Sequence, residues 1–381
     1  MSKVRYFSLS FVALLSLLGL VGCGGPPPPQ GEALIYVAVP LSGFQANGGQ
    51  TVLGGANLMA QQVNRAGGAA GYNLKVVGVD DESDSDVAVK VANQIKSDLA
   101  EGKKVIGVVG HYNSGQTLAA MEIYKDLPIL VITPTSSEVS ITQKGYPNIF
   151  RVNANDVTQG KVDAEFLVNQ LKARRIAVVH NDTAYGKGLR DQITQALKNL
   201  GAEVVLTLQV KEGQDKYATE VGRIKGANPD AIFYAGYEIE TPYLRSDLVS
   251  AGVKVPMLAS DGAFLAATID EANGSAEGLY VSSFAPSPKS VVDSQWIREY
   301  QAVEYRNPDT YSINGYSAVD AIARAVKKAN SLDYKKILEA TRQLDFDSAV
   351  GHIAFDERGD LKQQRVFIFQ VKNNEFVQVW P

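Results

Sequence analysis

The chain has 381 residues, of which 45% are hydrophobic and 20% charged, with a formal net charge of −4 and one cysteine. This length is enough to bury the cores of two domains. An acidic balance without a basic, aromatic-rich cluster argues against nucleic acid as a partner. A single cysteine cannot form an internal disulfide, so burial must stabilise the fold.

An apolar segment opens the chain. Lys3 and Arg5 precede the apolar run 7–20, which has about the length of a secretory h-region and is too short to span a membrane. Gly22 and Cys23 follow, and the segment resembles a bacterial lipoprotein signal. That resemblance implies a signal peptide over 1–22 and multiple acylation of Cys23, since one acyl chain binds a membrane weakly. The alternative is an ordinary cleaved signal with an incidental cysteine.

Residues 23–33 follow the signal and are rich in glycine and proline, with four consecutive prolines at 26–29. Such a stretch predicts a stiff spacer between the membrane and the folded body. Removal of 1–22 moves the formal charge from −4 to −6, because Lys3 and Arg5 are its only charged residues. We expect an exported, lipid-anchored protein facing the periplasm or the cell exterior, with the choice of membrane open.

Short β-rich runs alternate with helical patterns along the body. Most of these runs are continuously apolar, which is typical of parallel strands covered by helices on both faces. The predicted strands are 34–41, 73–80, 105–110, 128–134, 175–180, 203–210, 231–237, 256–260 and 278–283.

The intervening segments have helical spacing. Asp84 or Ser85 can cap a helix that uses Val87, Val91, Ile95 and Leu99 as its apolar face, with Gly102 at the C-terminal turn. Residues 156–171 and 189–201 repeat this arrangement, and the pattern breaks and restarts near 148–155. These repeats predict an α/β fold of two doubly wound lobes with parallel central sheets.

Polar residues gather where the predicted strands end, and ligands of open α/β sheets bind outside the carboxyl ends of strands. Two such rims facing each other would form a cleft. The residues are Ser42, Asp80, Asp81, His111, Asn113, Ser114, Thr135, Ser136 and Ser137 in the first set, and Asn181, Asp182, Tyr185, Tyr237, Glu238, Ser260 and Asp261 in the second.

Ser114 begins a predicted helix that continues to Tyr124. Free N–H groups and the helix dipole there attract an anion such as a carboxylate, and the hydroxyls of Thr135 and Ser137 can supplement them. The alternative for each hydroxyl taken singly is helix capping or a loop role.

Asp261 follows an apolar run and precedes Gly262, and it is the natural counter-charge for an ammonium group. The alternative is a turn aspartate that bonds its own backbone. Aromatic residues can wall the same cleft, although each taken singly is more often part of a core. They are Phe44, Tyr112, Tyr185, Tyr237 and Tyr311.

Several motifs together resemble the branched-chain amino acid binding protein family, the type I solute receptors of ABC importers. The resemblance extends from about Leu34 to the C-terminus with few gaps. The motifs are VIGVVGHYNSGQTLAAMEIY (105–124), PILVITPTSSEVSITQKGYPNIFR (128–151), VVHNDTAYGKGL (178–189), AIFYAGYEIET (231–241), MLASDGAF (257–264), SAEGLYV (275–281) and FDERGDLK (355–362).

The resemblance implies two lobes joined by three crossovers, with 34–153 and 284–362 in the N-terminal lobe and 154–283 and 363–381 in the C-terminal lobe. It implies a free amino acid as ligand, held without chemical change, and an ABC permease as membrane partner. The matching positions assign the ligand's carboxylate and ammonium to Ser114, 135–137, Tyr237 and Asp261, and assign closure from the second lobe to Tyr185.

The residues that depart from the family pattern lie mainly in the pocket for the ligand's side chain. Asp261 is one methylene shorter than the family's glutamate, and Gly48 stands where the leucine receptor has a tyrosine. Tyr112 replaces an aliphatic residue, Tyr311 a phenylalanine, and Ser83 and Asn113 replace that receptor's disulfide cysteines. These changes predict a broader range of neutral, branched-chain or other hydrophobic amino acids. A cationic side chain accepted by Glu238 is the alternative.

Little in the sequence supports a catalytic function. His111, His180 and His352 lack metal-ligand spacing, and no nucleophile elbow, P-loop or dinucleotide fingerprint occurs. The acidic run 80–86 lacks the glycine and final glutamate of an EF-hand and predicts a solvated loop with a helix cap. We expect no catalytic residue, metal or cofactor, and we interpret His111 as structural. An extracytoplasmic sensor of an amide or other small polar solute, and an exported α/β enzyme, remain as alternatives.

Overall fold

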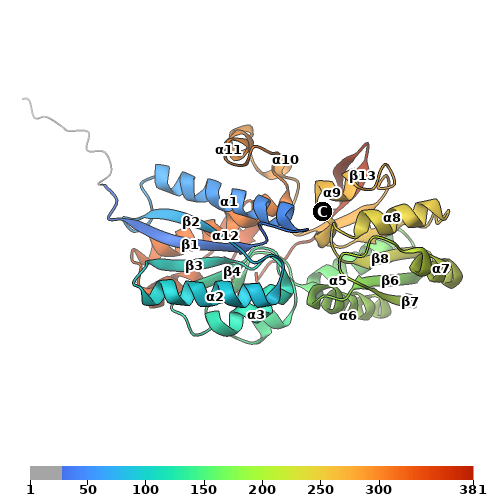
Figure 1. Cartoon of the computed structure of the whole chain (residues 1–381), viewed down its shortest axis with the longest axis horizontal. Helices are drawn as coiled ribbons and strands as arrows, with labels where there is room; N and C mark the ends of the chain where they lie inside the picture. The colour runs from blue at the N-terminus through green and yellow to red at the C-terminus, as the bar shows by residue number, and fades with distance from the viewer. Residues whose placement is uncertain (1–27, 381) are drawn as a thin grey trace, which may run out of the picture.

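Two large β-sheets organise the chain in its computed structural model, which describes residues 28–380 (Figure 1). The predicted signal peptide, Cys23 and the first part of the spacer lie outside the described residues. Within residues 28–380, no helix combines the length and the apolar character that a membrane crossing needs.

The first sheet has the strand order β2-β1-β3-β4-β5, and all its neighbours are parallel. Its strands are β1 (Glu32–Val39), β2 (Asn73–Asp80), β3 (Val105–Gly110), β4 (Leu130–Thr133) and β5 (Ile149–Arg151). The predicted parallel, buried character is confirmed, and all six residues of β3 are buried. β1 begins two residues earlier than predicted, so 32–33 belong to the sheet and not to the spacer.

Helices cover both faces of the first sheet. One face packs against helices from both ends of the sequence, and α1 and α12 lie against each other. These helices are α1 (Ala46–Arg65), α11 (Ser294–Glu304), α12 (Thr310–Ala329) and α13 (Tyr334–Arg342). The other face packs against α2 (Ser85–Ala100) and α3 (Ser114–Tyr124). The short elements α4 (Ser140–Gln143), α10 (Pro288–Val291), β11 (Phe346–Ser348) and β12 (Gly351–Ile353) complete this lobe.

The second sheet has the order β14-β13-β10-β9-β8-β6-β7. Five strands are parallel, as predicted: β6 (Arg175–Asn181), β7 (Glu203–Val210), β8 (Ala231–Ala235), β9 (Met257–Ala259) and β10 (Tyr280–Ser283). The last two, β13 (Phe367–Lys372) and β14 (Glu375–Trp380), are an antiparallel hairpin that the sequence analysis did not predict. Asn373 and Asn374 both have positive φ, as a two-residue hairpin turn requires.

Two helical layers also enclose the second sheet. α5 (Asp156–Glu165), a π-helical turn η1 (Phe166–Gln170) and α6 (Ala184–Asn199) cover one face. α7 (Ala218–Ala227), α8 (Thr241–Ser250) and α9 (Ala266–Asp270) cover the other. The 3₁₀ turn η2 (Asp261–Ala263) begins after Ser260, just beyond β9, and places Asp261 near the end of a parallel strand.

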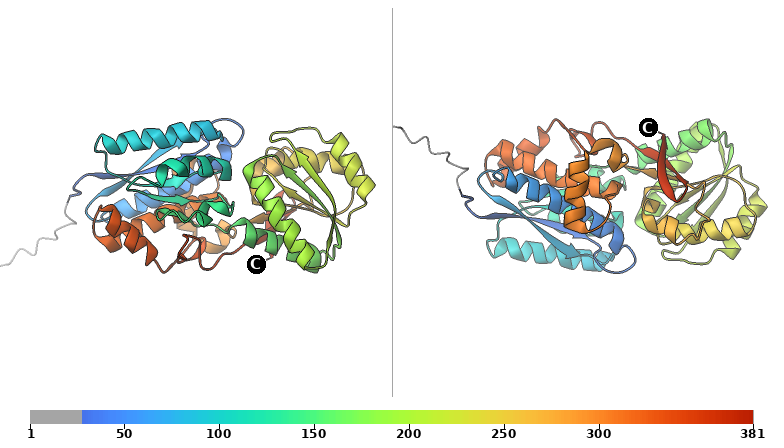
Figure 2. Two further views of the ribbon diagram at one scale, coloured as in Figure 1. Left: turned by 90° about the horizontal axis from the view of Figure 1, so that it is seen from below. Right: turned by 90° about the horizontal axis from the view of Figure 1, so that it is seen from above.

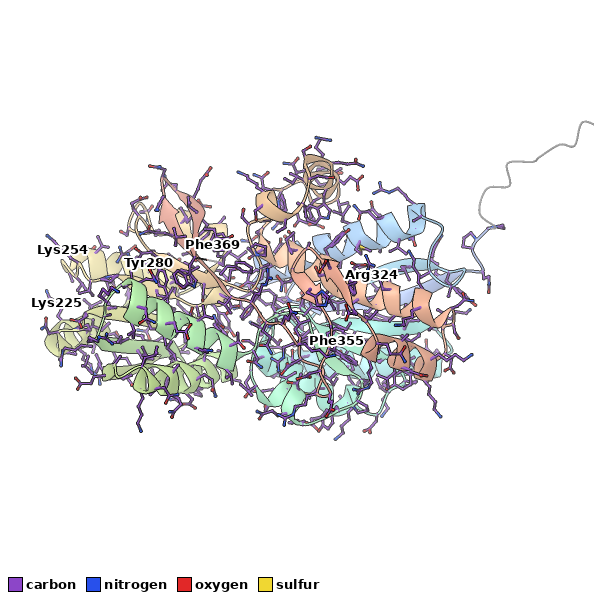
Figure 3. All side chains as sticks on the ribbon, turned by 180° about the vertical axis from the view of Figure 1, so that it is seen from behind. Lys225, Lys254, Tyr280, Arg324, Phe355 and Phe369 are labelled. Carbon is purple, nitrogen blue, oxygen red and sulfur yellow. The ribbon has the colours of Figure 1, made fainter. Side chains whose placement is uncertain are left out.

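The chain passes between the two lobes three times, through the segments after β5, after β10 and before β13. Both lobes therefore contain residues from distant parts of the sequence, as the two views of Figure 2 show. Figure 3 makes the third passage visible, because Phe355 lies in the first lobe whereas Phe369 lies beside Tyr280 in the second. The predicted α/β fold of two doubly wound lobes is confirmed.

The acidic loop after β2 has the capping role expected for it. The Asp84 carboxylate accepts hydrogen bonds from the N–H groups of Asp86 and Val87 and so caps α2. Asp80 accepts from the N–H groups of Leu41 and Glu82, at 2.8 and 2.9 Å. Asp80 and Asp84 thus bond the backbone around them, whereas Asp81 is fully buried and its Oδ2 lies 2.7 Å from His111 Nδ1. The buried face of α2 is shifted from the predicted one and uses Ala88, Ala92 and Ile95.

Candidate functional site

A small cavity lies between the lobes, where the carboxyl ends of strands from both sheets face each other. Eight of the ten predicted site residues line it, together with Gly262. The first lobe contributes Tyr112, Asn113, Ser114, Thr135 and Tyr311, and the second contributes Tyr185, Tyr237, Asp261 and Gly262.

The first-lobe wall contains the start of α3. Asn113 is the residue before the helix and makes no side-chain cap, and Ser114 occupies the first helical position with 2% exposure. The first N–H groups of a helix have no partner within it, so their positive partial charge is available to a ligand. This end of the cavity can therefore bind an anionic group.

The loop after β4 adds to this wall and is held rigidly from behind. The Asn314 amide donates to the carbonyl of Pro134 at 2.8 Å, and the Asn153 amide donates to that of Thr135 at 3.1 Å. The buried Arg151 guanidinium donates to the carbonyl of Ser136 at 3.1 Å. With these carbonyls already bonded, the loop keeps one orientation, and Thr135 remains at the cavity surface.

The second-lobe wall is built around Asp261, whose side chain is 4% exposed. Its Oδ1 accepts hydrogen bonds from the Tyr185 hydroxyl at 2.6 Å and from Gln159 Nε2 at 2.9 Å. Burial raises the pKa of Asp261 to about 6, although these two bonds oppose the shift. A buried carboxylate without a cationic neighbour would be stabilised by a ligand ammonium.

Aromatic rings close the sides of the cavity. Tyr185 and Tyr237 stack with their ring centroids 5.3 Å apart and an interplanar angle of 13°. Tyr112 and Tyr311 meet edge to face at 5.4 Å. The hydroxyl of Tyr311, on α12 of the first lobe, donates to the backbone carbonyl of Asp261 at 2.6 Å. One hydrogen bond thus joins the two lobes at the cavity.

Two predicted residues do not line the cavity. Phe44 is 85% exposed because it lies in the turn before α1 and points outward. Ser137 is fully buried behind the wall, and its carbonyl accepts the N–H of Asp156 at 2.9 Å. The structure therefore corrects the prediction that these two side chains reach the site.

His111 lies under the site and is fully buried. Its Nδ1 is 2.7 Å from Asp81 Oδ2, and its Nε2 is 3.1 Å from the Tyr124 hydroxyl. Its carbonyl accepts hydrogen bonds from the hydroxyls of Thr133 and Ser136, both at 2.9 Å. These contacts connect three strand ends, which agrees with the structural role expected for this histidine.

The departures at Gly48 and Tyr112 are coupled in the structure. A Cβ at residue 48 would overlap the Tyr112 hydroxyl, so the tyrosine ring occupies the space that the glycine leaves. Ser83 and Asn113 are also neighbours, because the Ser83 hydroxyl lies 3.4 Å from Asn113 Oδ1. Both bond Gln45 Oε1, at 2.7 and 2.9 Å, so hydrogen bonds join these two positions.

Sequence reasoning missed Gln159, which bonds both Asp261 and the Ser282 hydroxyl. It also missed Arg151 and Asn314, which hold the loop after β4. None of the three ends a predicted strand, so the strand-end rule had no reason to select them. Among the described residues, no group of three or more His, Cys, Asp or Glu side chains is arranged to hold a metal ion.

These features define a two-lobed binding protein for one small solute: an interlobe cavity, three connecting segments, anion-binding donors on one wall and a buried carboxylate on the other. The comparisons agree. Residues 35–375 match the periplasmic binding protein family, and the chain belongs to that family.

Relatives with established names cover nearly the whole chain. The chain is 31% identical over 331 residues to a leucine-, isoleucine-, valine-, threonine- and alanine-binding protein of Pseudomonas aeruginosa, covering 86% of this chain and 87% of that protein. It is 29% identical over 350 residues to a Leu/Ile/Val-binding protein homologue of Brucella melitensis, covering 91% and 92%.

Solved structures show the same fold. A leucine-binding protein of Thermotoga maritima has a TM-score of 0.82 at 25% identity, covering 91% of this chain and 97% of that chain. A branched-chain amino acid transporter substrate-binding protein of Streptococcus pneumoniae, in complex with isoleucine, has a TM-score of 0.82 at 24% identity, covering 92% and 100%. The resemblance to the leucine/isoleucine/valine-binding group is thereby confirmed.

Proposed function

We propose that this protein is the extracytoplasmic solute-binding component of an ABC importer and that it binds a neutral amino acid, branched-chain or otherwise hydrophobic, between its lobes. The observation that carries the proposal is the polarity of the cavity. Helix N–H groups lie on one wall and the buried Asp261 carboxylate on the other. A zwitterion offers one group to each wall.

Each lining residue has a role in this proposal. Ser114 and Thr135 hold the ligand's α-carboxylate with the free N–H groups of α3. Asp261 pairs with the α-ammonium, and the Tyr185 hydroxyl holds the Asp261 carboxylate in place by a hydrogen bond. Tyr237, stacked on Tyr185, covers the ligand from the second lobe. The ligand is released chemically unchanged, because the site acts only by binding it.

The connecting segments act as the hinge in this proposal. We assign 34–153 with 284–362 to one lobe and 154–283 with 363–381 to the other, and binding draws the lobes together. The Tyr311 hydroxyl bond to Asp261 supports this, since it already joins the lobes at the site. The closed form is then the one that a membrane permease recognises.

The N-terminus supplies the membrane link in this proposal. Cleavage before Cys23 and its acylation would anchor the protein, with the proline-rich spacer holding the lobes away from the bilayer. Tethering raises the effective concentration of the receptor at its permease without adding contacts. Substitution of Cys23 by serine should release the protein from membranes, which fractionation after expression in a bacterium would measure.

Calorimetric titration with the common amino acids tests the ligand class. We expect binding of several neutral amino acids and no binding of their N-acetyl or methyl-ester forms, because each derivative removes one charge of the zwitterion. Recovery of the bound ligand unchanged would support a role in binding alone. Binding restricted to an acidic or basic amino acid, or to a neutral amide without an α-ammonium, would contradict the proposal.

A further inference from the structure

A buried row of polar side chains on α5 lies behind the second-lobe wall of the cavity. Asp156, Gln159 and Asp163 are three and four residues apart, so they share one face of the helix, and all three are fully buried. They lie outside the lining of the cavity. This row therefore acts on a ligand only through a side chain that does reach the cavity, and Gln159 contacts such a side chain, Asp261.

Three hydrogen bonds connect this row to Asp261. The amide nitrogen Nε2 of Gln159 donates to Asp261 Oδ1 at 2.9 Å and to the Ser282 hydroxyl oxygen at 3.0 Å. The Ser282 hydroxyl in turn donates to Asp163 Oδ2 at 3.2 Å. Because Ser282 belongs to β10 and Asp261 to η2, these bonds join the helix, the sheet and the turn that carries the proposed ammonium site.

The direction of each bond is fixed by its partners. An ionised carboxylate accepts hydrogen bonds and donates none, so the amide of Gln159 must turn its NH₂ group toward Asp261. The Ser282 hydroxyl gives its single hydrogen to Asp163, and its oxygen is left to accept the second N–H of Gln159. A rotated amide would place its own oxygen against these two oxygens. Ser282 and Asp163 thus fix the orientation of the amide.

Asp163 takes part in these bonds as a neutral acid. It is fully buried, and burial raises the pKa of Asp163 well above its usual value. Its Oδ1 has no hydrogen-bond partner among the described residues and is the oxygen on which the proton can lie, which leaves Oδ2 to accept from Ser282. A neutral acid adds no like charge that would oppose the ionisation of Asp261.

The titratable groups that face Asp261 from the elements around it are acids and phenols. They are Asp156 and Asp163 on α5, Tyr185 on α6, Tyr112 after β3 and Tyr311 on α12. Within residues 28–380, no Lys, Arg or His side chain forms an ion pair with Asp261. The side-chain hydrogen bonds from Tyr185 and Gln159 oppose the effect of burial on the pKa of Asp261.

We propose that Gln159 is a positioning residue of the ammonium site, and that Ser282 and Asp163 orient its amide so that it holds Asp261 as an oriented carboxylate anion. This inference rests on the proposed function, since Asp261 affects a ligand only by pairing with its ammonium group. Gln159 itself touches no ligand, because it is fully buried outside the cavity lining. Its loss should change the pH at which Asp261 becomes protonated and leave the shape of the cavity as it is.

Calorimetric titration with the tightest-binding neutral amino acid, repeated from pH 5 to pH 8.5, tests this inference. For the unaltered protein, the affinity should fall to half of its plateau value near pH 6, where Asp261 becomes protonated. Gln159→Met keeps the approximate size of the side chain and removes both donors. It should raise this midpoint by about one pH unit, since a hydrogen bond to a charged group is worth that much. At pH 8.5 the two affinities should agree within about threefold, because Asp261 is ionised in both proteins.

Two further positions test how the amide is held. Ser282→Ala removes the acceptor of the second N–H and should also raise the midpoint. Asp163→Leu should raise it too, whereas Asp163→Asn should restore the original midpoint, because a carboxamide oxygen accepts from Ser282 as a neutral acid does. Asp320→Asn, which alters a buried acid on α12 away from the cavity, is the control and should leave the midpoint near pH 6.

A loss of affinity by the same factor at every pH in Gln159→Met would overturn the inference, because it would indicate damage to the cavity and not a change at Asp261. A midpoint that Gln159→Met leaves unchanged would overturn it as well, and so would one that Asp163→Asn shifts as far as Asp163→Leu. If Gln159→Met does not fold, Ser282→Ala decides by the same criteria. Each of these results leaves the proposed function intact, which would fail instead if no amino acid bound to the unaltered protein.

Discussion

Removal of the Asp261 carboxylate is the change that most directly probes the ammonium site. Asp261 is 4% exposed, and the two side chains that donate hydrogen bonds to its carboxylate, Tyr185 and Gln159, are neutral. A ligand ammonium would therefore meet one uncompensated negative charge in a nearly water-free space. Asp261→Ala should abolish that pairing while leaving the α3 wall unchanged.

The magnitude follows from that burial. Truncating one partner of a buried, hydrogen-bonded charge pair costs about 2–5 kcal/mol, which is roughly thirtyfold to several-thousandfold in affinity. We expect a value inside this range. Burial raises the pKa of Asp261 to about 6, so part of the pairing energy offsets the cost of keeping the Asp261 carboxylate ionised.

Calorimetry with the tightest-binding neutral amino acid measures this loss, and circular dichroism checks that the variant is folded. Asp320→Asn serves as the control, since it also alters a buried acid but lies on α12 away from the cavity. An affinity for Asp261→Ala within twofold of the unaltered protein would refute the assignment of the ammonium to this carboxylate.

Three further predictions follow from buried groups. The ligand's ammonium pairs with the ionised form of Asp261, so the affinity for the ligand should fall about tenfold between pH 7 and pH 5. Asp261→Asn should remove most of this pH dependence. An affinity of the unaltered protein that does not change with pH would contradict this prediction. The folded-state pKa of Glu238 is raised from 4.5 to about 8, so this acid destabilises the fold as the pH rises above 4.5. Glu238→Gln should increase the free energy of unfolding in urea by up to about 3 kcal/mol at pH 7 and by almost nothing at pH 4. Gly48→Ala should cost about 1–3 kcal/mol by overlap with Tyr112, and Tyr112→Leu in the same chain should recover most of it, as urea unfolding of both variants would measure.

The parallel strands were predictable because burial on both faces leaves a continuous apolar run that is visible in sequence, as in β3. The terminal hairpin β13–β14 was not predicted, because its pairing depends on an Asn373–Asn374 turn and on a sheet formed by residues far earlier in the chain. Local pattern carries little information about such distant partners.

The same distinction applies to the candidate site, where residues near strand ends were predictable and residues placed by packing were not. Ser114, Thr135, Tyr237 and Asp261 lie in the short segments just beyond strand ends, so topology alone brings them to one cavity. Gln159 reaches Asp261 from the interior of α5, a position that depends on how two elements pack. The coupling of Gly48 to Tyr112 likewise appears only in three dimensions, because 63 intervening residues separate them and no sequence pattern links a missing side chain to the ring that fills its space.

The central claim is that a zwitterionic neutral amino acid lies between the lobes with its two charges on opposite walls. A crystal structure of the protein grown with its tightest-binding amino acid tests this claim most directly. We predict the α-carboxylate within hydrogen-bond distance of Ser114 and Thr135, and the α-ammonium within hydrogen-bond distance of Asp261. A ligand bound outside this cavity, or one whose ammonium points to the start of α3, would contradict the account.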